Sequence, residues 1–317
     1  MCTRPNYMVY YRTASLKDKP STWKFFGHYN YDELIKEKQD FVEVPCGQCL
    51  ECRIQYTRSW ANRCEIESRK SKDNYFITLT YDDEHLPPHG SLDPNDTDRF
   101  IHSIRDYFRH RGFKGKIRYF YCGEYGDQTF RPHYHLVLFN CPLDDLTYEF
   151  KQMEDGRLKK HLRPNNNGDL MYSELIHKCW DYKGEISVGR FSYDTAAYVA
   201  QYCTKKINPK LKDKYAEMNV HPEFLRMSKG IGENGFKKEL YELDNICIAG
   251  KISALPRYYD KLFKKIDVNE FVNVQRTRNM AKYVRYDTYI NSDQHKERVD
   301  EMREYRLKKL SKTREQI

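Results

Sequence analysis

The chain of 317 residues has no apolar run that approaches the ~20 residues of a membrane-spanning helix, and its N-terminus has no apolar secretory core. We therefore expect a cytoplasmic protein that makes no membrane contact. Its ten cysteines would then remain mostly reduced thiols. No segment has the Gly-Lys-Ser/Thr ending of a P-loop, so we expect no nucleotide-driven motor activity.

Basic residues outnumber acidic ones, with 55 lysines and arginines against 46 aspartates and glutamates and a net charge of +9. A basic chain attracts phosphates through counterion release, and the 15% of aromatic residues offer rings on which single-stranded bases can stack. A protein that is simply soluble can also carry many charges of both signs, and most rings belong in a core. Composition therefore agrees with a nucleic-acid partner without establishing one.

A pair of histidines lies in a strand-like segment. His133 and His135 are two residues apart, so on a strand their imidazoles project from the same face and can bind one cation together. Glu124 ends another strand-like run nine residues before His133 and offers a carboxylate. Two neutral imidazoles and one carboxylate suit Mg²⁺ or Mn²⁺, which keep open positions for water and substrate. The alternative is that the histidines cap a half-polar strand and that Glu124 is a solvated turn residue.

A second group of polar side chains follows Asp194, where alanines and apolar spacing predict a helix with Asp194 as its N-cap and Pro209 as its stop. Tyr198 and Tyr202 are four residues apart and share one face of this helix, and Lys205 follows one turn later. A phenol with a pKa near ~10 needs a metal-polarised electrophile or a neighbouring cation to act as a nucleophile. Together with the three ligands, these residues predict attack on a phosphodiester. The alternative is an amphipathic helix that buries tyrosine rings.

Four cysteines form a separate pattern. Cys46, Cys49 and Cys52 make a C-x₂-C-x₂-C run, and Cys64 comes twelve residues later. A structural zinc ion could use all four as a Cys₄ site. The alternative is that Cys52 and Cys64 are small core residues of a helix predicted over residues 50–70.

The overall pattern predicts an α+β fold in which an antiparallel sheet has helices on one face. The predicted strands are residues 41–44, 75–81, 117–122, 134–139 and 186–188, and a further helix is predicted over residues 97–111. We expect an N-terminal segment with the cysteine-bearing helix (1–72), a central domain (73–208) and a mixed C-terminal region with a charged helical tail (209–317).

Three other segments have less definite patterns. Residues 143–182 form a polar insertion in which residues 164–168 predict a turn or loop. Residues 227–232 are glycine-rich and basic, which fits either a phosphate-cradling loop or an ordinary turn. Residues 292–317 alternate acids and bases without an apolar core, which is typical of a solvated helix or a disordered arm.

Several segments, taken in order, resemble a known family. Residues 133–135 (His-Tyr-His) resemble the His-hydrophobe-His motif of the HUH endonucleases, the rolling-circle replication initiators and relaxases. Residues 76–81 look like that family's first-strand motif, and residues 202–205 are similar to its Tyr-x-x-Lys motif. The order of the motifs resembles the replication initiators of microviruses, especially the gokushovirus-like group, over about residues 44–260.

The resemblance implies an RRM-like HUH nuclease domain over residues 73–208 and a metal-dependent DNA nickase and strand transferase. One tyrosine would nick single-stranded DNA at the phage origin, keep the 5′-phosphate as phosphotyrosine and release a 3′-hydroxyl that primes synthesis. The other tyrosine would later rejoin the strand. Tyr202 would cut first because Lys205 stands in the family position relative to it, and Gln201 stands where some two-tyrosine relatives have lysine.

Such an initiator without a P-loop would need a host helicase and DNA polymerase as partners, in the cytoplasm of a bacterial host cell. Two other classes stay open. A non-catalytic single-stranded nucleic-acid-binding module would explain the charge and the aromatic residues, but it would leave the tyrosines and the ligands unused. A mononuclear iron oxygenase also uses two histidines and a carboxylate, although its usual first pair is His-x-Asp/Glu.

Overall fold

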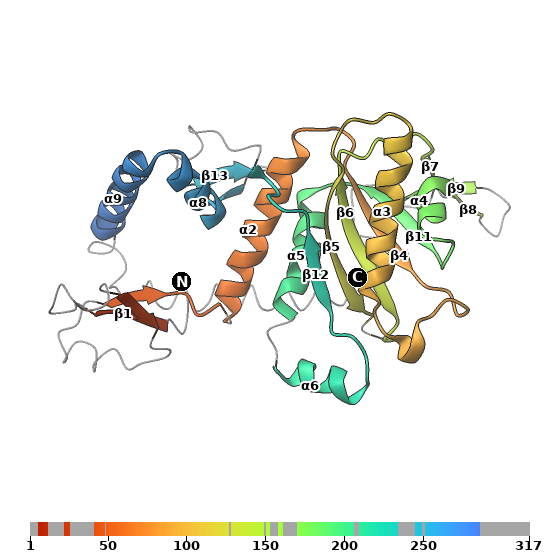
Figure 1. The fold of residues 1–317 in the computed structure, drawn as a ribbon, viewed down its shortest axis with the longest axis horizontal. Coiled ribbons are helices and arrows are strands. Elements are labelled where there is room, and N and C mark those ends of the chain that lie inside the picture. The colour runs from red at the N-terminus through yellow and green to blue at the C-terminus, as the bar shows by residue number, and fades with distance from the viewer. Residues whose placement is uncertain are drawn as a thin grey trace.

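The structure is a computed structural model that describes residues 6–11, 22–25, 41–47, 49–126, 128–148, 150–152, 158–160, 170–205, 209–233, 245–248 and 251–285. Its main sheet contains β4 (Tyr75–Thr80), β5 (Arg118–Tyr125), β6 (Pro132–Phe139), β7 (Thr147–Tyr148), β10 (Met171–Tyr172), β11 (Ile186–Arg190) and β12 (Phe224–Met227). These seven strands lie in the order β12-β5-β6-β4-β11-β10-β7, and every neighbouring pair is antiparallel. Figure 1 shows the sheet in the right half of the view.

Helices pack on the sheet and beside it. They are α2 (Leu50–Ser68), α3 (Pro94–His110), α4 (Glu174–Cys179), α5 (Tyr193–Lys205), α6 (Pro209–Glu217), α8 (Arg257–Ile266) and α9 (Val268–Arg285), with a short 3₁₀ turn at Pro88–Gly90. None of the helices among the described residues is long and apolar enough to cross a membrane.

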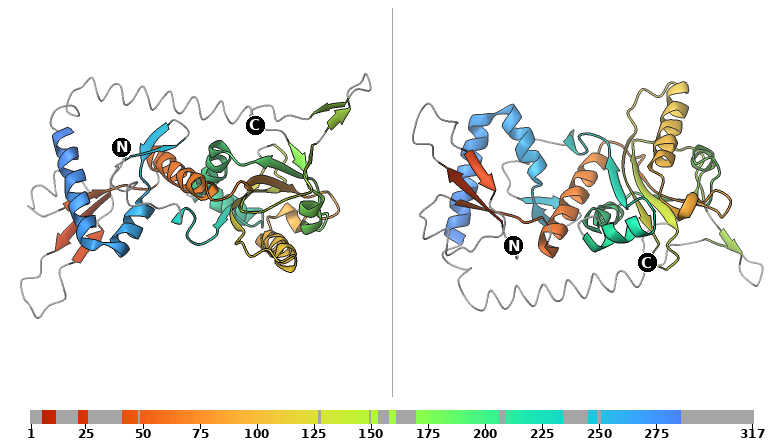
Figure 2. Two further views of the ribbon diagram at one scale, coloured as in Figure 1. Left: turned by 90° about the horizontal axis from the view of Figure 1, so that it is seen from above. Right: turned by 60° about the horizontal axis from the view of Figure 1, so that its bottom comes forward.

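Both faces of the sheet are covered by helices. Residues such as Ile77 and Leu79 of β4 pack with the apolar face of α3 and with α4. Phe76, on the opposite face of the same strand, packs with α5 and α2. Figure 2 shows α3 and α5 on opposite sides of the sheet. The prediction of helices on one face is therefore wrong, and the physical reason is that the central strands are nearly continuously apolar, so each face needs a cover.

The predicted main elements are confirmed with small shifts at their ends. The cysteine-bearing helix, the helix after residue 94 and the strands before and after the histidines all form where apolar periodicity placed them. Asp93 caps α3 by accepting a hydrogen bond from the N–H of Asn95. Residues 164–168 and 292–317 lie outside the described residues.

Smaller sheets lie outside the central one. β3 (Phe41–Val44), which was predicted, pairs with β1 (Asn6–Tyr11), which in turn pairs with β2 (Thr22–Phe25). Two-stranded ribbons form from β8 (Phe150–Gln152) with β9 (Leu158–Lys160) and from β13 (Asn245–Ile248) with β14 (Lys251–Ala254). The polar insertion thus contributes strands and α4 as well as loop.

The glycine-rich segment 227–232 is an ordinary turn fixed from inside the protein. The N–H of Gly232 donates to Glu67 Oε2 at 2.7 Å, and Arg118 donates to the carbonyl of Lys229 at 2.7 Å. Gly232 has φ +77°, and a Cβ there would lie 2.8 Å from the carbonyl oxygen of Arg63, so the position requires glycine. This backbone N–H is used internally, which favours the turn over the phosphate-cradling alternative.

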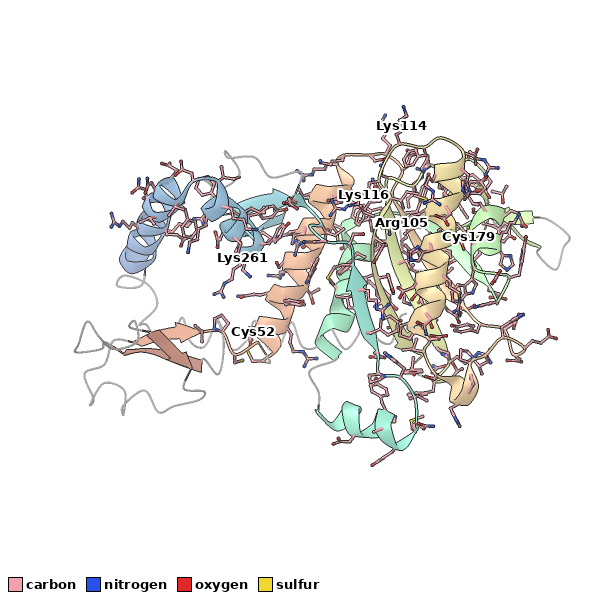
Figure 3. The ribbon with its side chains drawn as sticks, viewed as in Figure 1. Cys52, Arg105, Lys114, Lys116, Cys179 and Lys261 are labelled. Atoms are coloured by element: carbon pink, nitrogen blue, oxygen red, sulfur yellow. The ribbon has the colours of Figure 1, made fainter. Side chains whose placement is uncertain are left out.

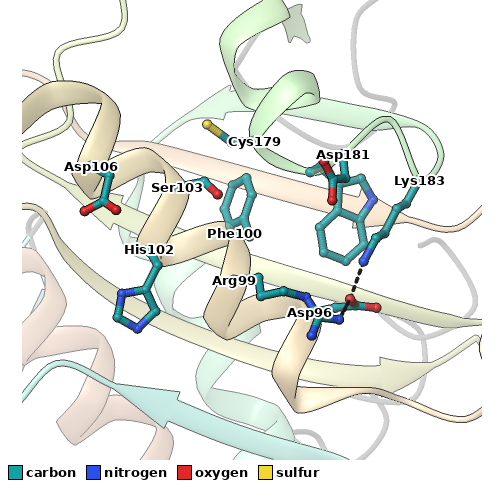
Figure 4. A pocket seen from close by; sticks show the side chains of 10 residues that line it. Asp96, Arg99, Phe100, His102, Ser103, Asp106, Cys179, Asp181 and Lys183 are labelled. Carbon is teal, nitrogen blue, oxygen red and sulfur yellow. Dashed lines mark hydrogen bonds and ion pairs between the residues drawn. The ribbon is translucent and has the colours of Figure 1, made fainter. Parts of the chain in front are cut away.

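A pocket lies on the α3 side of the sheet, between α3 and the turn after α4 (Figure 4). Its most buried acid, Asp96, pairs with Lys183 and Arg99 and accepts a 2.6 Å hydrogen bond from the hydroxyl of Tyr81. Burial would raise the pKa of Asp96, but the hydrogen bonds from Lys183, Tyr81 and Arg99 outweigh it and lower the pKa. We interpret this network as a structural tie between α3 and the loop before β11.

Candidate active site

The strand register brings the three predicted ligands together on the α5 face of the sheet. Glu124 of β5 is directly paired with His133 of β6, and His135 follows two residues later on the same face. The register is fixed by a tight turn in which the N–H of Gly126 donates to the carbonyl of Arg131. Glu124 is 2% exposed and His135 is 7% exposed, so the alternative of a solvated Glu124 in a turn is wrong.

The ligand atoms converge on one point. The Nε2 atoms of His133 and His135 each lie 2.8 Å from Glu124 Oε1, and the three ligand atoms all lie within 4.8 Å of one another. The two imidazole rings meet edge to face at 5.0 Å. The result is a compact N₂O donor set on one face of the sheet.

Backbone and hydroxyl partners orient both imidazoles. His133 Nδ1 lies 3.1 Å from the carbonyl oxygen of Arg131, which can only accept, so Nδ1 carries the proton and Nε2 of the neutral ring has a lone pair. His135 Nδ1 lies 3.1 Å from Thr78 Oγ1, which can fix the same tautomer. Such outer partners are characteristic of histidines that bind metals through Nε2. Two lone pairs facing a carboxylate oxygen are stable when a cation lies among them or when the rings are protonated.

The electrostatics of Glu124 favour a bound cation. Burial alone would raise the pKa of this carboxyl, but the hydrogen bonds from His133 and His135 outweigh it and hold the pKa at about 2. Glu124 is therefore a carboxylate at neutral pH. A divalent ion that accepts hard oxygen and imidazole nitrogen fits this set, and the three side chains would supply three of its ligands.

Helix α5 places Tyr198 against the ligands. The hydroxyl of Tyr198 lies 3.2 Å from Glu124 Oε1 and 3.4 Å from His135 Nε2, and its ring meets the His135 ring edge to face at 5.0 Å. Ala196, Val199 and Ala200 are fully buried and seat the helix on the sheet and on α2. The phenol is thus directed at the point where the cation would lie.

The start of α5 differs from the prediction. The helix begins at Tyr193, and Ser192 caps it: Ser192 Oγ accepts from the N–H of Thr195, and Thr195 Oγ1 accepts from the N–H of Ser192. Asp194 therefore lies in the first turn and is not the N-cap. Both residue types can cap a helix, and the hydroxyl earlier in the chain took the role because the strand before it ends at Arg190. Pro209 begins α6, as expected of a proline that cannot continue α5.

The other predicted residues of this helix are placed by their backbone. Tyr202 and Lys205 both lie within α5, one and two turns after Tyr198, and their side chains are outside the described ones. Gln201 is exposed. The shared helix face of the two tyrosines stays a prediction that rests on helical geometry.

Three of the four predicted zinc ligands gather at the start of α2. The sulfur atoms of Cys46, Cys49 and Cys52 lie within 4.8 Å of one another, and Figure 3 shows Cys52 at this end of the helix. Cys64 does not belong to this group, because twelve residues of helix place it about 18 Å farther along the axis. It is fully buried in the apolar cluster beneath α5. The Cys₄ set with Cys64 is therefore wrong.

Residues outside the predicted set support the site. Thr78 faces His135 across the β4–β6 pair, and Phe76 stacks on the His135 ring at 5.6 Å with an interplanar angle of 7°. Tyr134 projects to the opposite face, where its hydroxyl accepts from the N–H of Asp93 at 2.8 Å and so fixes the strand. The alternation of Phe76 and Thr78 in their strand signalled that both share one face, but only the register shows which histidine they meet.

Comparisons with known proteins agree with this geometry. Residues 74–207 match a family model whose description is that of a replication-associated protein of the ORF2 type. The chain is 36% identical over 263 residues to the "Replication-associated protein ORF2" of Spiroplasma virus 4, which covers 78% of this chain and 77% of that protein. The chain belongs to this family of phage replication-associated proteins.

Two further relatives of this replication-associated protein carry the same description. The "Replication-associated protein VP4" of Bdellovibrio phage phiMH2K is 34% identical over 247 residues, which are 75% of this chain and 72% of the relative. The "Replication-associated protein ORF4" of Chlamydia phage 1 is 25% identical over 246 residues, 76% of this chain and 59% of the relative. No solved structure matches the chain. The metal ligands and Tyr198 all lie in the part of the replication-associated protein that matches the family model.

Proposed function

We propose that this replication-associated protein initiates rolling-circle replication as a metal-dependent, site-specific endonuclease of the HUH type that cuts single-stranded DNA through a tyrosine. One observation carries the proposal: a tyrosine hydroxyl lies within 3.4 Å of two members of a buried Glu–His–His set. A nucleophile and a divalent-cation site in contact are what phosphodiester transfer requires. The net charge of +9 suits a DNA substrate.

The chemistry follows from the roles of the side chains. Glu124, His133 and His135 would hold Mg²⁺ or Mn²⁺, which when bound would polarise the scissile phosphodiester and neutralise its oxygens. The hydroxyl of Tyr198 donates to Glu124 Oε1, so its oxygen is oriented toward the position of the phosphate. As the phenol oxygen bonds to phosphorus, its proton leaves and the bond to the 3′-oxygen breaks. The products are a 5′-phosphotyrosine and a free 3′-hydroxyl.

A second tyrosine makes the strand transfer reversible after one circuit of synthesis. We assign it to Tyr202, which lies one helical turn after Tyr198 in α5, and we assign to Lys205 the stabilisation of negative charge on the phosphate. The contacts of Tyr198 support it as a nucleophile, while the Tyr-x-x-Lys spacing supports Tyr202 for the first cut. Rejoining needs no ATP, because the phosphotyrosine bond conserves the energy of the broken one.

The proposed reaction implies its partners. The protein would bind single-stranded DNA at the phage origin, and the released 3′-hydroxyl would be extended by a host DNA polymerase with the help of a host helicase. The reaction would take place in the cytoplasm of the bacterial host, where those enzymes work.

The proposal is tested by incubating the protein with Mn²⁺ and a tiled set of labelled single-stranded oligonucleotides that covers the phage genome, followed by a denaturing gel. We expect a covalent protein–DNA adduct on one tile, abolished by EDTA and by the double change Tyr198→Phe with Tyr202→Phe. Tyr193→Phe is the matched control, because Tyr193 lies in α5 but packs against the α2 and α8 region away from the ligands. Tight DNA binding with no adduct under any divalent metal would instead support the non-catalytic binding module.

A further inference from the structure

We infer that Cys203 of α5 joins Cys46, Cys49 and Cys52 as the fourth ligand of a structural zinc ion that ties the start of α2 to the end of α5. The inference does not rest on the proposed nuclease activity. It replaces Cys64 with a cysteine from a different helix, and it gives the C-x₂-C-x₂-C run a role at the base of the candidate active site.

The three cysteines at the start of α2 have the geometry of a zinc knuckle. Cys46 Sγ and Cys52 Sγ are 4.0 Å apart, and the N–H of Cys49 donates to Cys46 Sγ at 3.3 Å. Tetrahedral zinc with bonds of about 2.3 Å separates its sulfur ligands by about 3.8 Å, which is close to the observed spacing. Gly47 has φ +74°, which allows the tight turn between the first two cysteines. A backbone N–H directed at a sulfur stabilises a thiolate ligand.

The packing of α2 against α5 is antiparallel. Tyr193, the first residue of α5, packs beside Ile66 near the end of α2. Ala200, seven residues later, accepts a 3.5 Å hydrogen bond on its carbonyl from Thr57 Oγ1. As α5 advances, its neighbours on α2 therefore move back toward the cysteine run.

Extending this register brings Cys203 to the level of the cysteines. Cys203 lies three residues beyond Ala200, or about 4.5 Å along the axis, and Cys52 lies five residues before Thr57, or about 7.5 Å in the same direction. The two positions therefore differ by only about 3 Å in height along the paired helices.

Helical spacing also assigns position 203 to the correct face. Ala196, Val199 and Ala200 are fully buried and belong to the cluster that includes Trp60, Ala61 and Cys64 of α2. Position 203 follows 196, 199 and 200 at the i+7, i+4 and i+3 spacings of one helical stripe. The face that α5 turns toward α2 therefore contains position 203.

The placement has a consequence for the nucleophile helix. Cys203 immediately follows Tyr202 in the chain. A zinc ion bound to position 203 would fix the last turn of α5 against α2 and so hold the backbone of Tyr202 in place. The small side chains along the α2–α5 contact leave the two helices close enough for one ion to span them.

The inference is tested by measuring zinc bound per full-length chain, by native mass spectrometry and by metal analysis after dialysis, in wild type and single variants. Wild type should retain one zinc, and Cys49→Ser and Cys203→Ser should each weaken its retention at least tenfold. Cys64→Ala and Cys2→Ser are the matched controls and should retain zinc as wild type does. Cys203→His should restore binding, because imidazole is also a zinc ligand.

Cobalt substitution adds a readout that misfolding does not mimic. The sulfur-to-cobalt absorbance of the Cys203→His protein should fall by roughly a quarter, as one of four thiolates is replaced. Retention of zinc at wild-type strength by Cys203→Ser would overturn the assignment. So would loss of zinc in Cys64→Ala or Cys2→Ser, or a wild-type protein that holds no zinc after expression in zinc-supplied medium.

Discussion

Thr78 offers the sharpest test of how the sheet prepares the metal site. Its hydroxyl lies 3.1 Å from His135 Nδ1, on the side of the ring away from the ligand nitrogen. Replacement with valine keeps the shape of the side chain but removes the oxygen, so the imidazole loses the partner that fixes its tautomer and orientation. Loss of such an outer partner weakens metal binding about 10- to 100-fold, or about 1.4–2.7 kcal/mol.

The assay is titration of the metal-free protein with Mn²⁺, followed by calorimetry or by electron paramagnetic resonance of the unbound ion. Thr80→Val is the matched control. Thr80 lies on the same strand and face, opposite His133, but its hydroxyl donates to the carbonyl of Glu185. We expect Thr78→Val to weaken Mn²⁺ binding, Thr78→Ser to restore most of it, and Thr80→Val to leave it within twofold of wild type. Equal affinities for Thr78→Val and wild type would refute the assigned role of Thr78.

Two further predictions concern the same elements. The pKa of Glu124 is about 2 in the folded protein against an ordinary 4.5, so its stabilising effect is complete above pH 4.5 and is lost as the pH falls toward 2. In EDTA, the difference in unfolding free energy between wild type and Glu124→Gln should shrink over that range, and a difference that grows would contradict the assignment. Ser192→Ala should lower the unfolding free energy by about 1 kcal/mol because it removes the cap of α5, and Asp194→Ala should cost less; urea titration that reversed this order would restore Asp194 as the cap.

The sequence predicted the parts of the site that depend on local periodicity. The spacing of His133 and His135 places both imidazoles on one face of any strand. The pairing of Glu124 with His133 could not be predicted, because it depends on the turn between β5 and β6, where Phe130 adopts φ +54°. One residue more or less in that turn would have moved the carboxylate to the other face.

Two of the wrong predictions had signals in the sequence that pointed the other way. The central strands contain runs such as Phe76 and Ile77 in which consecutive residues are apolar, and this pattern is typical of a sheet buried on both faces. A single helix over residues 50–68 separates Cys52 from Cys64 by three turns, which already prevents both from binding one ion. The contact between α2 and α5, by contrast, joins segments about 140 residues apart and required the structure.

The most direct test of the proposed function is to identify the amino acid that becomes bound to DNA. The protein would be incubated with Mn²⁺ and its cognate single-stranded oligonucleotide, digested with nuclease and protease, and the peptide carrying the residual nucleotide sequenced by mass spectrometry. The account predicts a 5′-phosphotyrosine at Tyr198 or Tyr202 in the peptide derived from α5. A nucleotide attached to any other residue, or nicked DNA with no covalently modified peptide, would contradict it.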